Sequence, residues 1–382
     1  MSRRSTPRSH HGCARCKKSR VKCDEVKPSC TRCSRRNQAC SFQIELAHSP
    51  VPFYVLDSHP LSRAVAHHVS CDPAARTIMH HFLTSIRPFL AVDDLSKPLR
   101  LWDGLIQRQG VVNTYVLYNI LSLSAFHLAI HTQASQSKYL ARGIYYQNKA
   151  LSQMVPNSHR VTEETCEGMF TSSLLVVTCC FAMGRAIAGV GEGNLDMIRR
   201  VVEISRLMRG TLAIFRAGWQ LSLDKQTIPH IRRSFITLNR QMVPESPGSD
   251  GSLDMLTRRI EANVDDKERK LRYFQAIAFM KTSIRKASSR STSCAFLLVV
   301  VGRISDELLV EMEAREPIPL ILLAHWAVQL HWAKDTWWLA TWGQRVVEVV
   351  RANLDTAWWD YIRWPLTEVG MLSHADGQFC PA

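Results

Sequence analysis

The sequence predicts an all-α protein in which a small, metal-stabilised N-terminal module precedes a larger and mostly helical domain. Three observations lead to this expectation. Six cysteines with a duplicated spacing fall within residues 13–40. From about residue 74 onward, apolar residues recur at helical steps. Two-residue turn signals flanked by alternating strand patterns, which would indicate β-hairpins, are absent from the sequence.

Composition and charge narrow the class of protein. The chain has 382 residues, 46% of them hydrophobic, which is enough for a sizeable core beside a small module. Of the 48 Lys and Arg, twelve lie in residues 1–40, where only two acidic residues oppose them. Such a local excess of positive charge, within a net charge of +15, favours an anionic partner, either nucleic acid or a membrane surface.

The sequence predicts an intracellular chain without a membrane span. The N-terminal residues lack the apolar segment of a secretory signal. The apolar runs at residues 174–183 and 294–301 are shorter than the roughly 20 residues that a membrane helix needs. Cysteines inside a cell stay reduced, so a cluster of them indicates a metal site more strongly than disulfides.

The six clustered cysteines repeat the pattern C-x2-C-x6-C, with six residues between the two copies: Cys13, Cys16, Cys23, Cys30, Cys33 and Cys40. Each C-x2-C turns two thiolates onto one ion, and the third cysteine returns to that ion. Six thiolates can give two zinc ions four ligands each only if two cysteines bridge. The symmetry of the repeat selects Cys13 and Cys30 as the bridges.

The expected ligand sets are therefore Cys13, Cys16, Cys23 and Cys30 for one zinc ion, and Cys30, Cys33, Cys40 and Cys13 for the other. Both sites would be closed to water, so the two zinc ions are expected to be structural. The stretch is too short and polar to fold by apolar burial, and structural zinc contributes on the order of 10–16 kcal/mol. The alternatives are a disulfide knot or a chance cluster.

The run GCARCKKSRVKCDEVKPSCTRCSRRNQAC, residues 12–40, resembles the fungal Zn(2)-Cys(6) binuclear cluster family of transcription factors. The resemblance implies bridging by Cys13 and Cys30, and a loop shaped by Pro28 between the two halves. In that family the basic residue four positions after the second cysteine contacts a CGG-type triplet, and this residue is Arg20 here. The preceding position, often basic in the family, is Ser19.

The segment after Cys16 predicts a short basic helix that binds double-stranded DNA. Lys17, Lys18, Arg20 and Lys22 lie within one cysteine-bounded stretch, and such side chains can donate to guanine in the major groove. The basic residues of the second half are expected to contact phosphates: Arg32, Arg35 and Arg36. The alternative interpretation is a solvated basic face, or a nuclear import signal.

Around the zinc module (residues 13–40) we expect a basic disordered tail at residues 1–12, a linker at 41–73 and a helical regulatory domain at 74–382. Pro50, Pro52, Pro60 and Pro73 punctuate the expected linker. Ile78, Phe82 and Ile86 then begin a helical pattern. Residues 241–252 (QMVPESPGSDGS) are expected to form a loop, and residues 254–286, which are rich in charge, an exposed helix.

Eight of the ten tryptophans lie in the last 57 residues, which predicts either core packing or an apolar pocket for a hydrophobic small-molecule effector. The segments NILSLSAFHLA, LLAHWAVQLHWAKDTWW and WDYIRWP resemble the regulatory domain of sterol uptake control proteins and their relatives. That resemblance implies an all-α domain and lipid sensing. Separately, we expect the transcription machinery as a partner of the protein. Relatives of this kind serve varied pathways, including clusters of secondary-metabolite genes.

No catalytic constellation accompanies the cysteines. The glycine-rich residues 189–193 lack the dinucleotide-binding spacing, and neither G-x-S-x-G nor H-E-x-x-H occurs. His80, His81, His127, His325 and His331 are expected to be core or surface histidines. The remaining alternatives are a zinc-stabilised protein-interaction module and a nucleic-acid enzyme with a zinc targeting arm. We therefore expect a nuclear, DNA-binding regulator of RNA polymerase II genes and not an enzyme.

Overall fold

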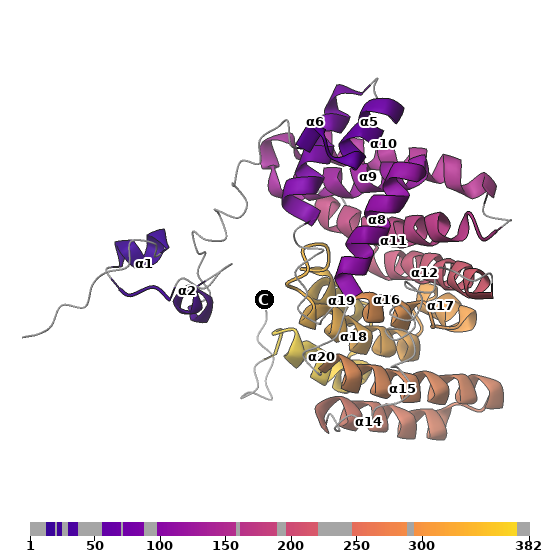
Figure 1. Ribbon diagram of the computed structural model, residues 1–382. Coiled ribbons are helices and arrows are strands. Elements are labelled where there is room, and N and C mark those ends of the chain that lie inside the picture. Colours follow the sequence, from indigo (N-terminus) through magenta and orange to yellow (C-terminus); the bar gives the residue numbers. More distant parts are fainter. Residues whose placement is uncertain are drawn as a thin grey trace, which may run out of the picture.

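The fold is taken from a computed structural model of the chain, shown in Figure 1. It describes residues 13–19, 21–24, 30–36, 56–69, 72–87, 98–157, 161–188, 196–220, 247–288 and 294–372. Within these ranges the regular structure is helical and contains no strand, which confirms the all-α prediction.

The described helices fall into a small N-terminal module and a helical domain. The module contains α1 (Ala14–Lys18) and α2 (Thr31–Arg35), each little more than one turn long. The first part of the helical domain consists of α5 (Pro60–His68), α6 (Pro73–His81), the π-helical turn η1 (Phe82–Ile86), α8 (Pro98–Val112), α9 (Thr114–His131), the 3-10 turn η2 (Gln133–Ser135), α10 (Gln136–Met154), the 3-10 turn η3 (Val155–Asn157), α11 (Cys166–Ala188) and α12 (Met197–Gln220).

The second part of the helical domain follows residue 246. It consists of α14 (Pro247–Asn263), α15 (Lys267–Ser288), α16 (Cys294–Val301), α17 (Asp306–Glu313), α18 (Pro317–Trp332), α19 (Trp342–Ala352), the 3-10 helix η5 (Thr356–Ile362) and α20 (Arg363–Glu368). Figure 1 shows α5 and α6 at one end of this domain and the α14–α15 pair at the other.

The helices of the domain pack mainly on neighbours in the chain. Helix α9 contacts α6, α8, α10 and α11, and α11 in turn packs against α12. Helix α12 then reaches α16, α17 and α19, so it joins the two parts of the domain. Helix α18 completes the second part through contacts with α15, α17, α19 and α20. The domain is therefore built from successive helix pairs, with α12 at the junction.

Three helices form the centre of the core, because α9, α11 and α18 are apolar around most of their circumference and are largely buried. Among the largest fully buried side chains are Phe126 of α9, Phe181 of α11 and Trp326 of α18. Trp338 and Trp342 are also buried, and their rings pack against Phe181 at centroid distances of 5.5 and 4.8 Å. Core packing, one of the two interpretations of the tryptophan-rich segment, is confirmed for these three tryptophans.

One described helix, α11, is long and apolar enough to cross a membrane by length and composition. However, 72% of its most apolar window is buried inside the helical domain, as in the core helices of globular proteins. The apolar run at residues 174–183 is only the middle of this helix, which polar, small and further apolar residues on both sides extend to 23 residues.

Residues 60–68 form a helix where the sequence predicts linker, which corrects the start of the helical domain. Pro60 and Pro73 do not interrupt structure but occupy the first turns of α5 and α6, where a missing N–H costs nothing. The residues before them cap these helices, since the side chain of His59 accepts from the N–H of Leu61 at 3.2 Å and that of Asp72 from the N–H of Ala74 at 3.0 Å.

The expected loop at residues 241–252 is also corrected, because α14 begins at Pro247. As in α5 and α6, a proline stands at the start of this helix. Ser252, which the sequence assigns to the loop, lies within α14, and its hydroxyl donates to the carbonyl oxygen of Tyr361 at 2.6 Å. The charged segment that follows is not one exposed helix but parts of α14 and α15, each with a buried apolar side, including Leu256 and Ile277. The charges occupy the opposite side, so composition alone overstated the exposure.

Helix α19 approaches α18 so closely that Gly343 has no room for a side chain. A Cβ atom there would lie 2.5 Å from the backbone nitrogen of His331 and 2.6 Å from the carbonyl oxygen of Ala327. At Gly210 of α12, by contrast, no atom lies within 4 Å of the place that a Cβ atom would take.

We expect Gly343→Ala to lower the free energy of unfolding of the helical domain by about 1–3 kcal/mol, because the backbones of α18 and α19 must separate. The matched variant Gly210→Ala should be neutral or stabilising by up to about 1 kcal/mol, since alanine favours a helix. Urea denaturation followed by circular dichroism measures both. Equal stability of the two variants would contradict this close packing.

Candidate metal centre and nucleic-acid interface

Two copies of the same short unit position the clustered thiols. Cys13 lies at the N-cap of α1 and Cys16 within it, while Cys30 directly precedes α2 and Cys33 lies within that helix. The Sγ atom of Cys13 accepts from the backbone N–H of Cys16 at 3.4 Å, and the backbone nitrogen of Cys13 is 3.4 Å from the Sγ atom of Cys23. All five of these cysteines are buried.

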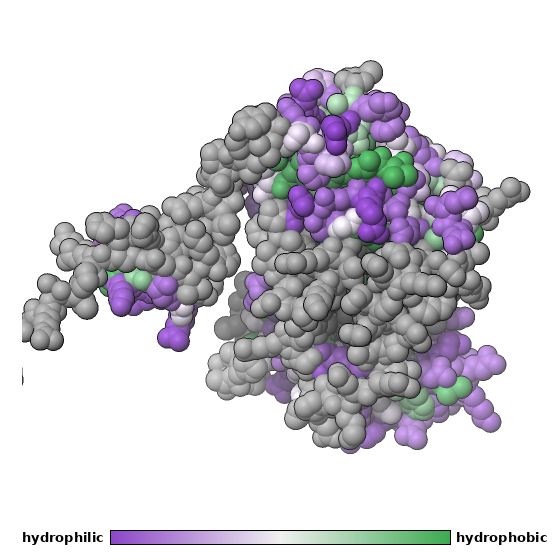
Figure 2. Space-filling model, viewed as in Figure 1, coloured by the Kyte–Doolittle hydropathy of each residue, from purple (hydrophilic) through white to green (hydrophobic). Residues whose placement is uncertain are grey.

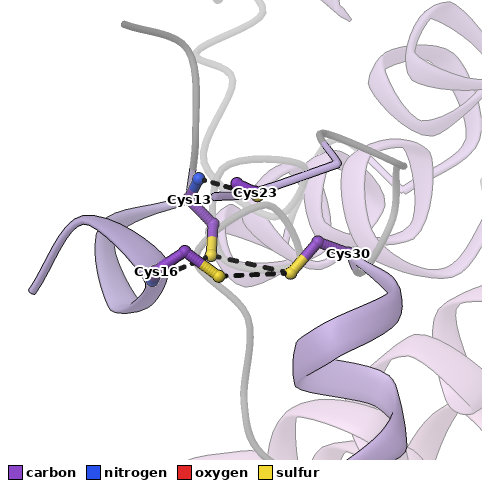
Figure 3. Close-up of side chains that lie close together, drawn as sticks. All are labelled: Cys13, Cys16, Cys23 and Cys30. Atoms are coloured by element: carbon purple, nitrogen blue, oxygen red, sulfur yellow. Dashed lines mark hydrogen bonds between the residues drawn. The ribbon is translucent and has the colours of Figure 1, made fainter. Parts of the chain in front are cut away.

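The sulfur positions match the geometry of tetrahedral zinc. A Zn–S bond of about 2.3 Å gives sulfur–sulfur distances of about 3.8 Å along the edges of a tetrahedron. The Sγ atom of Cys30 lies 3.8 Å from those of both Cys13 and Cys16. The Sγ atoms of Cys13, Cys16, Cys23 and Cys30 all lie within 4.8 Å of one another. Figure 3 shows these four side chains close together. These four are the ligands that the cysteine spacing assigns to the first ion.

Cys13 is close to thiols of both halves of the repeat. Its Sγ atom lies within 4.8 Å of those of Cys16 and Cys23 in its own half, and 3.8 Å from those of Cys30 and Cys33 in the second half. A cysteine that bridges two ions must lie close to ligands from each half, and Cys13 meets this requirement. Cys40, the remaining predicted ligand, lies outside the described residues.

The thiols need a cation to be ionised together. Burial raises the pKa of Cys16 to about 12, and burial also raises the pKa of Cys30 far above its usual range. Without a bound cation, these thiols would therefore stay protonated at neutral pH. A zinc ion reverses this preference, since a coordinating thiol is deprotonated outright. The site therefore fits zinc by distance and by the chemistry of its donors.

The outer surface of the same module is basic. Lys17 and Lys18 of α1 and Lys22 after it are exposed, as are Arg35 and Arg36 at the end of α2, while Arg32 is half-buried. No ion pair forms at these side chains within the described part of the chain. Figure 2 shows mostly hydrophilic atoms on the described part of the module. Arg20 lies outside the described residues.

Residues 11–49 match the family model of the fungal Zn(2)-Cys(6) binuclear cluster domain. The chain therefore carries a fungal-type Zn(2)-Cys(6) cluster domain near its N-terminus. Its binuclear cluster binds two zinc ions, so the cofactor expected from the cysteine spacing is confirmed.

Relatives resemble this Zn(2)-Cys(6) protein well beyond its cluster. A Zn(2)-C6 fungal-type transcription factor of Gibberella zeae is 22% identical over 95% of this chain and 86% of its own length. A second one, from Aspergillus fumigatus, is 22% identical over 83% of this chain and 84% of its own. A lysine biosynthesis regulatory protein of Saccharomyces cerevisiae is 50% identical over 34 residues, which are 9% of this chain and 4% of that protein. No solved structure matches.

The cluster domain and the relatives indicate a DNA-binding transcription regulator and not an enzyme. The resemblance to the Zn(2)-Cys(6) family is confirmed by these matches. The resemblance to the sterol uptake control proteins is not confirmed by them.

Two residues of the module were not predicted from the sequence. Both carboxylate oxygens of Asp24 accept from the backbone N–H of Thr31, at 3.2 and 3.1 Å, so a side chain from the first half caps the first turn of α2. Arg15 is exposed on α1, one turn before Lys18. Arg15 directly precedes Cys16 in the sequence, and this position could have identified it as part of the basic surface. The Asp24 cap could not be identified in this way, because it depends on how the two halves of the module meet.

We expect Asp24→Ala to speed the loss of zinc to a chelator, because α2 loses a cap of about 1 kcal/mol and Cys30 and Cys33 lose their support. Asp24→Asn keeps an acceptor oxygen and should stay close to the parent rate. Zinc release into a chromophoric chelator, followed in the full chain, compares the three proteins. If Asp24→Ala released zinc no faster than Asp24→Asn, the cap would have no part in holding the cluster.

Proposed function

We propose that this protein is a sequence-specific regulator of genes transcribed by RNA polymerase II, acting in the nucleus on double-stranded DNA. Two observations together carry the proposal. Sulfur atoms lie at tetrahedral zinc distances, and the helix that they hold carries the exposed Lys17 and Lys18, which form no ion pair among the described residues. A metal-fixed basic helix fits the major groove, where side-chain donors can contact guanine.

In this proposal one zinc ion takes Cys13, Cys16, Cys23 and Cys30, and the other takes Cys30, Cys33, Cys40 and Cys13. The closeness of Cys13 to thiols of both halves supports its bridging role. Both ions are structural, because all four positions of each are filled by sulfur and none remains for a substrate.

The DNA contacts divide between the two halves of the module. Arg20, with Lys17, Lys18 and Lys22, is assigned to base and backbone contacts in the major groove, at a CGG-type triplet. Arg32, Arg35 and Arg36 are assigned to phosphates, which set affinity and salt dependence without selecting a sequence. The exposure of Lys17, Lys18 and Lys22 around one short helix supports the first assignment.

The helical domain is assigned a regulatory role, through a hydrophobic small-molecule effector or a contact with the transcription machinery. The long matches to relatives named as transcription factors support a role of this domain in the same process. We propose further that the regulator is pathway-specific, controlling secondary-metabolite genes or lipid and sterol metabolism, by analogy with such regulators.

Replacing one bridging ligand should affect both metal sites. We expect Cys30→Ala to retain fewer than two zinc ions per chain and to lose specific DNA binding, because Cys30 serves both ions in the proposed arrangement. The control is Cys180→Ala, which removes a half-buried thiol of α11 far from the cluster in sequence. Metal analysis of the purified chains, with DNA binding before and after chelation, provides the measurement. Two zinc ions and full affinity in Cys30→Ala would overturn the bridging assignment.

Replacing the proposed base-reading residue should change specificity. We expect Arg20→Ala to weaken binding to a CGG-containing duplex by about 1–3 kcal/mol and binding to a scrambled duplex by less. The control, Arg76→Ala, removes an exposed arginine of α6 and should alter neither. Fluorescence anisotropy at one fixed salt concentration compares the duplexes. An equal loss on both duplexes would make Arg20 a phosphate contact.

A further inference from the structure

The outward side of α10 is an exposed surface that the zinc cluster and its DNA contacts do not explain. Helix α10 packs its other side against α9 and α11. We call the outward side the α10 face, and its exposed charged and large apolar side chains are Lys138, Ile144, Tyr145 and Lys149. Tyr145 lies seven residues after Lys138 and four before Lys149, so these three side chains form a row along the helix.

The α10 face exposes a group of apolar side chains. Ile144 and Tyr145 expose 38% and 47% of their surface to solvent. Five of the nine large apolar side chains that are exposed in the described part of the chain lie on α10 or next to its C-terminal end. Single exposed apolar side chains are ordinary, whereas a group of them at one place marks an interaction surface.

A second apolar group extends the α10 face beyond the end of the helix. Val155 directly follows α10 and exposes 56% of its surface, and Val112 at the end of α8 exposes 74%. The Thr114 hydroxyl donates to Oε1 of Gln153 at 2.7 Å, and this hydrogen bond holds the start of α9 beside the end of α10. Val112 and Val155 are each two residues from this hydrogen bond, so both lie at this end of α10.

Every charged residue of α10 is basic, since residues 104–162 contain no Asp or Glu. Arg142 is paired with the carboxylate that caps α6. Lys138 and Lys149 form no ion pair within the described part of the chain. The ammonium group of Lys149 lies 5.8 Å from the centre of the Tyr145 ring. The α10 face therefore presents two cations without a paired carboxylate, one before and one after its exposed apolar pair.

This pattern selects the class of partner. A second copy that presented the same face would bring like charges together. Lys138 and Lys149 are eleven residues apart, which is about 16 Å along a helix, whereas DNA carries one phosphate charge per about 1.7 Å of its axis. Two lysines with apolar side chains between them therefore suit DNA poorly. A protein segment that carries both carboxylates and apolar side chains matches the charge and the exposed apolar area together.

We propose that the α10 face binds an acidic amphipathic helix of another protein. Carboxylates about 16 Å apart on this partner pair with Lys138 and Lys149. Its apolar side covers Ile144 and Tyr145 and continues over the second apolar group, with the tyrosine as the central anchor. As an account of the partner contact assigned to the helical domain this rests on the proposed function, whereas binding at the face can be tested without DNA.

The first experiment measures binding of a synthetic peptide to the full, zinc-loaded chain. The fluorescein-labelled peptide has about 20 residues, enough for a helix of about 30 Å, with leucine and phenylalanine along one side and Asp and Glu flanking them. Fluorescence anisotropy should show saturable binding that weakens as salt is raised. A matched peptide with lysine at every acidic position should bind roughly tenfold more weakly or worse. Equal binding of the two peptides, or no binding of the acidic one, would overturn the proposal.

Charge reversal locates the bound peptide. The double variant Lys138→Glu with Lys149→Glu should bind the acidic peptide roughly tenfold more weakly and the lysine peptide more tightly than the parent does. The matched control is Lys267→Glu, at an exposed lysine of α15, which should change neither affinity. Unchanged binding of the acidic peptide in the double variant would place this peptide on the basic module and overturn the assignment to α10.

A further variant tests the apolar part of the face. Tyr145→Ser should weaken binding of the acidic peptide several-fold with an unchanged circular dichroism spectrum, because nearly half of the tyrosine surface is already exposed. Leu271→Ser removes an exposed apolar side chain of α15 and should have no effect. Unchanged affinity in Tyr145→Ser would show that charge alone attracts the peptide, which would overturn the proposed amphipathic fit.

DNA binding separates this proposal from the proposed function. The double lysine variant should bind a CGG-containing duplex as the parent does, because its cysteine module is intact. Loss of DNA affinity in this variant, with peptide binding unchanged, would make the α10 face a DNA contact and overturn the proposal. If instead Arg20→Ala left DNA binding unaltered, the assignment of the base contacts would fail while peptide binding to α10 would stand.

Discussion

The N-terminal module depends on metal coordination because its core is made of sulfur. Among its described residues the buried apolar set consists of Cys13, Cys16, Cys23, Cys30 and Cys33, and the one partly buried apolar side chain against them is Val21. So small an apolar set cannot offset the conformational entropy of the chain. Coordination of zinc supplies the missing free energy, and it also converts thiols that prefer to be neutral into ligands.

The same constraint explains why so short a helix can present a rigid surface. Helix α1 has only five residues, far fewer than an isolated helix needs in water. Ligands at Cys13 and Cys16, with Cys23 beyond them, fix both ends of the α1 segment, and the Asp24 carboxylate ties this half to α2. The lysines on α1 therefore keep their spacing before any DNA is met, which lowers the entropy cost of binding.

How much the sequence could predict depends on whether a feature is local. The cysteine spacing alone predicts the ligand set of the first ion, because only short segments of chain join the four cysteines. The helix at residues 60–68 was not predicted because proline is typical of both linkers and helix starts, and here Pro60 starts a helix whose side chains Leu61 and Val65 face the core. The contact of His81 with His127 joins residues 46 positions apart, and only the packing of α6 on α9 creates it.

The distribution of charge assigns the nucleic-acid contact to the module and not to the helical domain. Outside residues 1–40 the chain carries 36 Lys and Arg against 31 Asp and Glu, and many of these form pairs, such as Arg206 with Glu313 at 3.0 Å and Arg285 with Asp250 at 2.8 Å. Such pairs add little stability, but each cancels a charge that could otherwise attract phosphate. The cations around α1 have no such partners among the described residues, so the positive potential concentrates on the part of the chain that zinc holds rigid.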